Sequence, residues 1–268
     1  GDFNNDGKID IAVANMNTNV VTILLNNMLR ITPSSGADGT LVCSPTLVNP
    51  GDGASCLATP YPGYMIDTVT GCGGSLAGST YTISNTSADC TVTATFAVLT
   101  YPLNVSKAGT GFGTVTSAPA GINCGGDCSE DYVHDTVVAL TPSPDISSIF
   151  TGWSGDADCA DGSVTMTAAR SCTASFTLKS FTVTAVSGGN GNVSPLSQPK
   201  TYGSTASITV TPDSGYHVSS VSGCGGTWSA SSPYLTEPIT TNCEVMATFG
   251  NVAPTVPALI QPAGGSEV

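Results

Sequence analysis

A short run near the start of the chain places oxygen-bearing side chains at regular spacing. Residues 2–10 read Asp-Phe-Asn-Asn-Asp-Gly-Lys-Ile-Asp, with side-chain oxygens at the first, third, fifth and ninth positions. Gly7 permits a sharp turn, and the carbonyl of Lys8 stands where such loops use a backbone oxygen. This arrangement is typical of a Ca²⁺ loop, because a hard cation prefers oxygen donors. An EF-hand would have Glu at the twelfth position, where this chain has Val13.

Ten cysteines are the other residues with chemistry of their own. They are even in number, spread along the chain, and form neither a haem-attachment motif nor zinc-finger pairs. Structural disulfides are the better interpretation, and they indicate an oxidising compartment. We therefore expect a secreted or cell-surface protein.

Composition excludes several functions. The 268 residues carry a net charge of −13 and only six Lys and Arg, which is unsuited to binding nucleic acid. The same deficit argues against docking on anionic membranes. No run of about 20 apolar residues occurs, so we expect no membrane span.

Catalytic machinery is not evident. Only His134 and His217 could serve a nucleophile, and neither lies in a recognisable motif. Paired cysteines cannot act as nucleophiles. We therefore predict that the chain is not an enzyme.

Other candidate sites favour plainer interpretations. The spacing of Asp156, Asp158 and Asp161 is irregular, so a solvated turn is favoured over a metal site. His134 stands among acidic residues without a second histidine, which is typical of a surface cluster. Trp153 and Trp228 could stack on sugars, but packing against a core is the preferred interpretation for Trp153.

Internal repetition is the strongest pattern in the sequence. Three segments share a Thr-Pro pair, a Gly-Cys or Gly-Trp pair ten or eleven residues later, and a closing Phe. The marks are Thr59-Pro60, Thr141-Pro142 and Thr211-Pro212; Gly71-Cys72, Gly152-Trp153 and Gly223-Cys224; and Phe96, Phe176 and Phe249. On this alignment Trp153 replaces a cysteine.

The repeats predict a division of the chain. We expect a calcium-loop hairpin over 1–29, β repeats over 30–98, 99–178 and 179–250, and a Pro-rich linker or the start of another domain over 251–268. Alternation of apolar and polar residues, as in 181–186, indicates four or five short strands in each repeat. The predicted fold class is all-β: small disulfide-stapled repeats in an elongated array. Units this small bury little apolar surface, so cross-links supplement their cores.

The cysteines follow the repeats. The first and third repeats have matching pairs, and in the second both members have moved together, which favours pairing within each repeat. The expected pairs are Cys72–Cys90, Cys224–Cys243 and Cys159–Cys172, and proximity then leaves Cys43–Cys56 and Cys124–Cys128. Sequence alone cannot prove the connectivity.

The wording of the repeats resembles bacterial surface repeats related to the internalin B-repeat. The segment Lys-Ala-Gly-Thr-Gly-Phe-Gly-Thr-Val over 107–115, followed by Phe-Thr-Gly-Trp-Ser-Gly over 150–155, is especially similar. The resemblance covers roughly 220 residues of the chain. It implies a β-grasp-like module used as a spacer or adhesive stalk, with no catalytic residues.

Residues 1–27 resemble the FG-GAP or VCBS repeat of integrin-type β-propellers, which carries such a loop ahead of a strand. The resemblance rests on the loop and on the strand-like runs 10–15 and 20–27. It implies a Ca²⁺ site with these ligands: Asp2, Asn4, Asp6, Lys8 (carbonyl) and Asp10.

Two functions fit these features. The first is a noncatalytic extracellular structural protein: a stalk, adhesin segment or fibre subunit. The alternative is a noncatalytic appendage of a larger secreted hydrolase. The chain starts at Gly1 and its last residues are linker-like, so we expect a piece of a longer exported protein.

The pattern of residues 9–26 predicts a hairpin whose second strand is apolar on both faces. Strands of this kind are normally buried on both faces. The free edges of the hairpin invite pairing. Cover for both faces comes either from propeller blades ahead of Gly1 or from a neighbouring molecule. We favour the second route, which predicts head-to-tail self-association into a filament or larger array, with other surface proteins as alternative partners.

Overall fold

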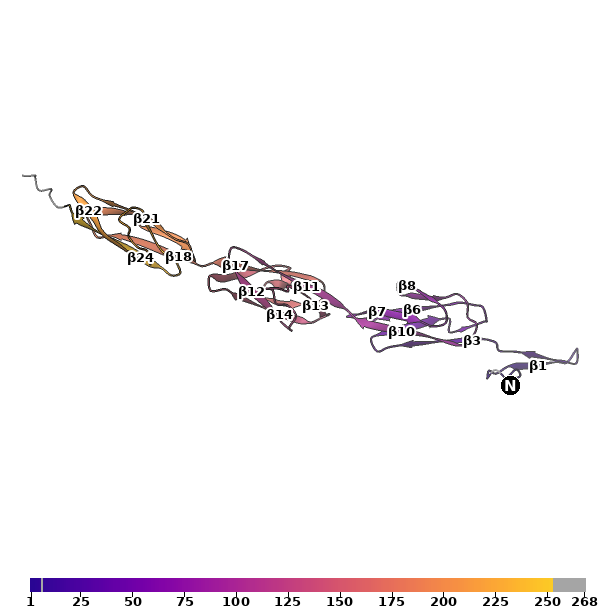
Figure 1. The fold of residues 1–268 in the computed structure, drawn as a ribbon. Coiled ribbons are helices and arrows are strands. Elements are labelled where there is room, and N and C mark those ends of the chain that lie inside the picture. The colour runs from indigo at the N-terminus through magenta and orange to yellow at the C-terminus, as the bar shows by residue number, and fades with distance from the viewer. Residues whose placement is uncertain (6, 253–268) are drawn as a thin grey trace, which may run out of the picture. The chain divides into compact units, whose positions relative to one another are not determined.

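The computed structural model describes residues 1–5 and 7–252 (Figure 1). Within those residues the chain is built from β-strands, and its helical structure is a single 3₁₀ turn, η1, at Ala157–Cys159. The predicted all-β class with disulfide-stapled repeats is confirmed. Contacts divide the chain into two compact units. One contains Gly1–Pro102, Asp131–Val137 and Thr165–Ala169, and the other contains Leu103–Glu130, Val138–Val164 and the described residues from Arg170 onward.

The N-terminal segment is a two-stranded antiparallel hairpin. Its strands are β1 (Ile11–Asn15) and β2 (Val20–Leu24), which pair from Ile11 with Leu24 to Asn15 with Val20. Every residue of both strands is exposed, although most are apolar.

The first repeat contains two four-stranded sheets, in the orders β5-β3-β10-β7 and β4-β6-β9-β8. Its strands are β3 (Leu29–Ser35), β4 (Gly39–Ser44), β5 (Leu47–Val48), β6 (Ala54–Pro60), β7 (Tyr64–Thr70), β8 (Ser75–Ala77), β9 (Thr80–Ile83) and β10 (Cys90–Val98).

The second repeat has a four-stranded and a three-stranded sheet, in the orders β13-β11-β17-β15 and β12-β14-β16. Its strands are β11 (Thr100–Ala108), β12 (Gly113–Ala118), β13 (Ser129–Val133), β14 (Val137–Pro144), β15 (Ser148–Gly155), β16 (Ser163–Thr165) and β17 (Arg170–Leu178).

The third repeat has the same plan, in the orders β20-β18-β24-β22 and β19-β21-β23. Its strands are β18 (Ser180–Ser187), β19 (Gly191–Ser194), β20 (Ser197–Thr201), β21 (Ser207–Pro212), β22 (Tyr216–Gly223), β23 (Tyr234–Leu235) and β24 (Cys243–Asn251). The expectation of four or five strands in each repeat is therefore wrong. Several two- and three-residue strands lack the length at which an alternating pattern becomes visible.

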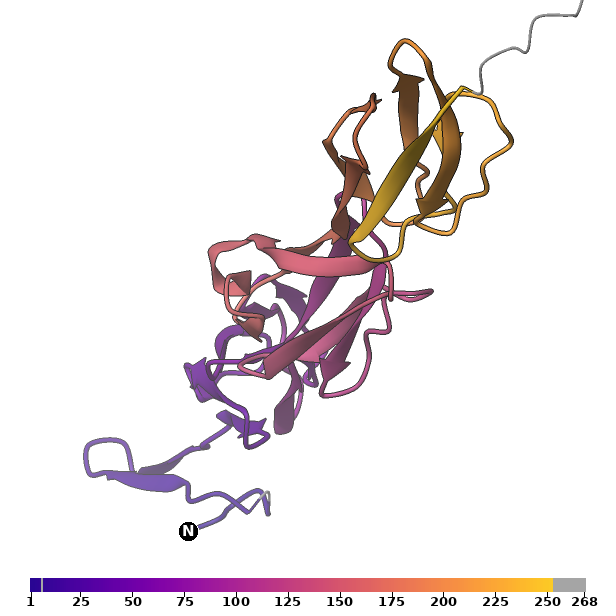
Figure 2. The same ribbon diagram turned by 90° about the vertical axis from the view of Figure 1, so that its left-hand side faces the viewer.

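One topology recurs in all three repeats. The first strand lies beside the last strand in parallel at the centre of a four-stranded sheet, in the pairs β3–β10, β11–β17 and β18–β24. The yellow strand β24 in Figure 2 is such a last strand, flanked by β18 and β22. In the first repeat, side chains from both sheets meet in one core.

Alternation along the last strands produces the cores. In β10 the residues Val92 and Ala94 are buried, while the threonines that alternate with them are exposed. The closing Phe packs on the glycine that opens the second strand, since a Cβ on Gly39 would lie 2.5 Å from the ring of Phe96. The corresponding pairs are Gly113 with Phe176 and Gly191 with Phe249.

Two marks in the second repeat need correction. Strand register places Pro144, not Pro142, opposite the glycine that opens the second strand, as Pro60 and Pro212 are in the other repeats. The glycine that follows eleven residues later is then Gly155 and not Gly152. Gly71, Gly155 and Gly223 all have positive φ, and in each a Cβ would lie 2.0–2.2 Å from a carbonyl oxygen of the last strand.

The assignment of Trp153 to a cysteine position is therefore also wrong. Trp153 pairs with the last strand where Val69 and Val221 do, at Ala174, Ala94 and Ala247 respectively. The residue in the cysteine position is Asp156, which follows Gly155 as Cys72 follows Gly71. Two marks that differ by two or three residues look alike in sequence, and only strand register separates them.

Successive repeats are joined by single residues. Leu99 alone lies between β10 and β11, and Lys179 alone lies between β17 and β18. The Leu99 amide donates to the carbonyl of Gly63 (2.7 Å), and the Leu99 carbonyl accepts from the amide of His134 (2.9 Å). Lys179 makes the same pair of bonds, with Ser147 and Tyr202, at 2.9 Å each.

Candidate calcium loop and disulfide staples

Asp10 closes the predicted calcium loop. It is 2% exposed, although it lies in the exposed N-terminal segment. Its carboxylate accepts hydrogen bonds from the amides of Phe3 and Asn26, each at 2.7 Å. The Asp10 amide also donates to the carbonyl of Gly1 at 2.6 Å. One carboxylate thus ties the loop to the chain just beyond the second strand, at the open end of the hairpin, a role that its spacing alone does not reveal.

These hydrogen bonds shape the titration of Asp10. The Asn26 amide, followed by the Phe3 amide, lowers the pKa of the Asp10 carboxyl because both bonds favour the ionised form. Burial acts in the opposite direction but is the weaker influence. The carboxylate is therefore held charged, as a cation ligand must be.

The other predicted ligands are more exposed. A side-chain oxygen of Asp2 accepts from the amide of Gly7 at 2.8 Å, which curves the loop, and Asn4 is at the surface. The Lys8 ammonium donates to the carbonyl of Met28 and lies 3.8 Å from Asp89. These contacts involve the side chain of Lys8 and not its backbone carbonyl, which is the predicted ligand. Asp6 lies outside the described residues.

The donor chemistry fits Ca²⁺. Each carboxylate oxygen of Asp10 keeps a second lone pair after accepting its amide, and Asp2 and Asn4 add further hard oxygens. Among the residues that the structure describes, no group of three or more His, Cys, Asp or Glu side chains lies ready to hold a metal. Calcium binding at this loop remains a prediction.

The structure joins all ten cysteines in five disulfides. The pairs are those expected from the repeats and from proximity in the sequence: Cys43–Cys56, Cys72–Cys90, Cys124–Cys128, Cys159–Cys172 and Cys224–Cys243. The loops that they close span 4 to 19 residues. Each disulfide lies within one repeat and so cross-links one small core.

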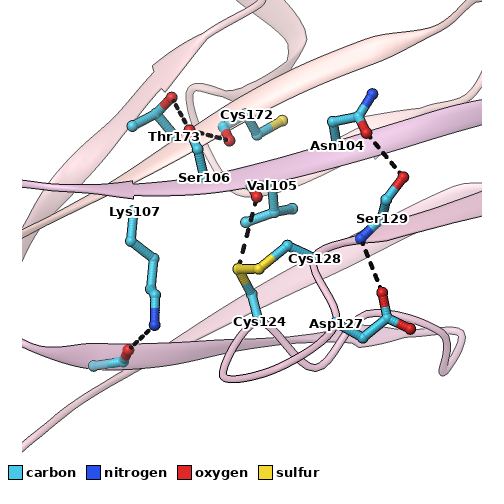
Figure 3. Close-up of a disulfide and its surroundings, with 11 residues drawn as sticks. Asn104, Val105, Ser106, Lys107, Cys124, Asp127, Cys128, Ser129, Cys172 and Thr173 are labelled. Carbon is cyan, nitrogen blue, oxygen red and sulfur yellow. Dashed lines mark hydrogen bonds between the residues drawn. A yellow bond between two sulfur atoms is a disulfide. The ribbon is translucent and has the colours of Figure 1, made fainter.

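The shortest staple secures a tight loop under the first strand of the second repeat (Figure 3). The Cys128 carbonyl accepts from the Val105 amide at 2.8 Å, and Cys124 is fully buried. Beside the disulfide, the Ser129 hydroxyl donates to the side chain of Asn104 at 2.8 Å. The disulfide therefore closes the loop, and these hydrogen bonds hold the closed loop to β11.

A family model accounts for most of the chain. The model of the divergent InlB B-repeat domain matches residues 29–99, 103–180 and 181–253. The chain belongs to the divergent InlB B-repeat family. The resemblance to internalin B-repeats is thereby confirmed, in three tandem B-repeats.

One similar solved structure is that of the Bacillus anthracis TIE protein, with a TM-score of 0.45 and 9% sequence identity. The similarity covers 87% of this chain and 53% of that one, so the chain spans about half the length of this structural relative. No curated protein matches the chain.

The matched family is a repeat domain and not a known enzyme family. The weaker candidates have structural partners. Asp156 accepts from the Ser171 amide at 2.6 Å, and Asp161 from the Ser163 amide at 2.9 Å. His134 lies 3.1 Å from Asp135 and against the ring of Tyr101.

Trp153 contacts the edge of Phe150, with ring centroids 5.4 Å apart, which agrees with a packing role. Within the described part of the chain, no helix is long and apolar enough to cross a bilayer.

Proposed function

We propose that the B-repeat chain is a noncatalytic, extracellular spacer that transmits tension as part of a stalk, an adhesin or a fibre. The observation that carries this proposal is the parallel pairing of the first and last strands in every repeat. The five disulfides support the extracellular location.

Parallel terminal strands suit a mechanical role for a geometric reason. The chain enters such a pair at one end of the sheet and leaves at the opposite end. Tension along the chain then slides β3 against β10, and the hydrogen bonds between them must fail together. In an antiparallel terminal pair, the two chain ends lie at the same end of the strands, and tension breaks the hydrogen bonds one after another.

The one-residue junctions carry the load from repeat to repeat. Leu99 and Lys179 each use both backbone polar groups in hydrogen bonds, one to a turn of the preceding repeat and one to a turn of the following repeat. A flexible linker would instead leave its backbone groups to water. Short, bonded junctions suit a spacer better than an enzyme appendage that must swing on a tether.

Single-molecule pulling on the full chain tests the proposal. Oxidised repeats should unfold one at a time at forces typical of sheared β-sheets. Reduction should lengthen the extension gained in each step, because residues within disulfide loops become available. The gain should be about 110 Å for the first repeat, about 60 Å for the second and about 70 Å for the third, at about 3.6 Å per released residue.

The decisive quantity is the unfolding force. Gradual extension at low force, without separate steps, would contradict a load-bearing role. The matched control pulls one repeat through handles on the adjacent strands β7 and β10 instead of through its two ends. Those antiparallel strands should separate at lower force, because their bonds open one after another.

The N-terminal hairpin supports two further parts of the proposal. Ca²⁺ bound through Asp2, Asn4, Asp6, the Lys8 carbonyl and Asp10 orders the loop, and β1 and β2 mediate self-association head-to-tail. The exposed apolar strands favour the second part. Sedimentation of the full chain and of a truncation starting at Met28 tests it, since β3 begins at Leu29. Equal behaviour of the two chains would reject self-association.

A further inference from the structure

The first and third repeats share two anchors, here called the frame, and differ in the loop between these anchors. In both, the sequence Cys-Gly-Gly, at 72–74 and 224–226, follows the glycine that lies close to the last strand, which is Gly71 or Gly223. Both close the frame with a tyrosine whose hydroxyl donates 2.7 Å to that glycine's carbonyl: Tyr81 to Gly71, and Tyr234 to Gly223. The tyrosines are buried, so the two frames are held in the same way.

Between these anchors the repeats diverge. In the first repeat the segment forms β8, which pairs along β9 and carries Leu76. The third repeat has one residue more, forms no strand over 227–233, and carries Trp228 at the position of Leu76. A half-open surface cavity of about 500 Å³ lies against this open loop.

The cavity wall has a distinctive chemistry. Trp228 is half-buried and packs against the core of the third repeat, which holds the indole in place while part of it remains accessible. Hydroxyls surround it, including Ser229 and Ser231, whose oxygens lie 3.1 Å apart. Glu237 is the only charged side chain among the lining residues described.

From this wall we propose that the cavity of the third repeat binds a neutral saccharide unit. The indole offers a flat apolar surface for the C–H face of a sugar ring. The Glu237 carboxylate accepts sugar hydroxyls, and the serine hydroxyls both donate and accept. A phosphate or carboxylate ligand is disfavoured, because the lining contains an acidic and no basic side chain.

The hydroxyl groups distinguish this proposal from a cation site. An indole and a carboxylate alone would also suit an alkylammonium group. However, such a group has no use for several hydroxyls around it, and it is usually enclosed by more than one aromatic ring. The loop supplies three serines and one tryptophan, which favours a polyhydroxylated ligand.

The two tryptophans allow a direct test by NMR on the full chain. Glucose, N-acetylglucosamine and their β1,4-linked disaccharides are the probes, added to tens of millimolar. The indole N–H signal of Trp228 should shift saturably, with a dissociation constant of about 1 mM or below for the best probe. The signal of Trp153, in the second repeat, should not move.

Variants separate binding from folding. Trp228→Leu installs the residue of the first repeat and should weaken binding roughly tenfold or more, as followed by calorimetry. Should that variant unfold, Glu237→Gln and Ser229→Ala should each weaken binding several-fold while the Trp228 signal stays in its native position. Leu76→Ala, in the corresponding place of the first repeat, is the matched control and should bind as the parent does.

Three results would overturn the proposal. One is the absence of a saturable shift with every sugar probe. Another is an equal shift of both indole signals, which would show nonspecific contact. The third is a shift of Trp228 by tetramethylammonium but not by sugars, which would assign the cavity to a cation.

Discussion

The second repeat differs from its neighbours in where its core is cross-linked. In the first and third repeats a disulfide joins the residue after the closely packed glycine, Gly71 or Gly223, to the start of the last strand, as in Cys72–Cys90. In the second repeat those positions hold Asp156 and Arg170. The disulfide lies deeper, where Cys159 and Cys172 are both buried.

This difference shows which features the fold requires. The position of the cross-link has moved, while the central parallel strand pair, the close approach at Gly71, Gly155 and Gly223, and the packing of Phe on glycine are the same in all repeats. Backbone proximity leaves no room for substitution, whereas a disulfide has several acceptable sites on a small core. The staple therefore adds stability to a topology that other contacts specify.

The close approach at Gly155 should give the largest effect. Gly155→Ala places a Cβ 2.2 Å from the Ser171 carbonyl oxygen and forces φ +112 on alanine. We expect a loss above about 5 kcal/mol, so that the second repeat fails to fold. Fluorescence of Trp153 during denaturation of the full chain reports on it. Gly152→Ala is the control: it also has positive φ, but nothing lies within 4 Å, so its cost should be clearly smaller.

The closing phenylalanines should give the next largest effect. Phe176 is 1% exposed, and Phe176→Ala should cost about 4 kcal/mol through lost burial and the cavity left behind. Phe96 is only partly buried, so Phe96→Ala should cost about 3 kcal/mol or less. Denaturant midpoints measured on each variant check the order. A larger loss for Phe96→Ala would show that the repeats are not packed alike.

Moving the staple tests the comparison most directly. Removal of Cys159–Cys172 by alanine substitution should cost about 3 kcal/mol, given a loop of 13 residues. Asp156→Cys with Arg170→Cys, added to that variant, should restore most of the loss, because these positions match Cys72 and Cys90. Mass spectrometry of nonreduced peptides shows whether the new bond forms. A bond that forms without regained stability would mean that the second repeat depends on the deeper site.

The N-terminal loop should respond with little effect on the repeats. Because the pKa of Asp10 is lowered in the folded loop, its stabilisation is complete above the ordinary value of 3.8 and is lost as pH falls through the lowered value. Amide exchange at Phe3 and Asn26 should accelerate in that range. Asp10→Asn should show fast exchange of these amides at every pH. Amide protection that is unaffected by both the fall in pH and the substitution would contradict the role of this carboxylate.

Calcium should slow the same exchange at neutral pH. Asp6→Ala should abolish this response by removing a central ligand, and calorimetry on both chains measures the binding. Glu130→Gln, on the second repeat, is a control that should leave calcium uptake unchanged. Equal uptake by the Asp6→Ala variant and the parent would exclude the loop as the site.

Much of this molecule follows from local sequence. Alternation in 181–186 and in the last strands indicated β structure, because side chains of a strand point to opposite faces in turn. The even number of cysteines and their place in the repeats indicated the same five pairs that the structure joins, since close spacing leaves few partners in a small unit. The loop at residues 2–10 showed its donor types, because ligand chemistry depends on residue identity.

Tertiary structure alone decided the rest. Strand register showed that Gly155 and Asp156, not Gly152 and Trp153, correspond to Gly71 and Cys72, because equivalence depends on which residues face each other across a sheet. The bond between Asp10 and the Asn26 amide links residues that the hairpin brings together. The cavity beside Trp228 lies where the third repeat has an open loop in place of the paired strand β8, a difference in backbone path that residue types do not reveal.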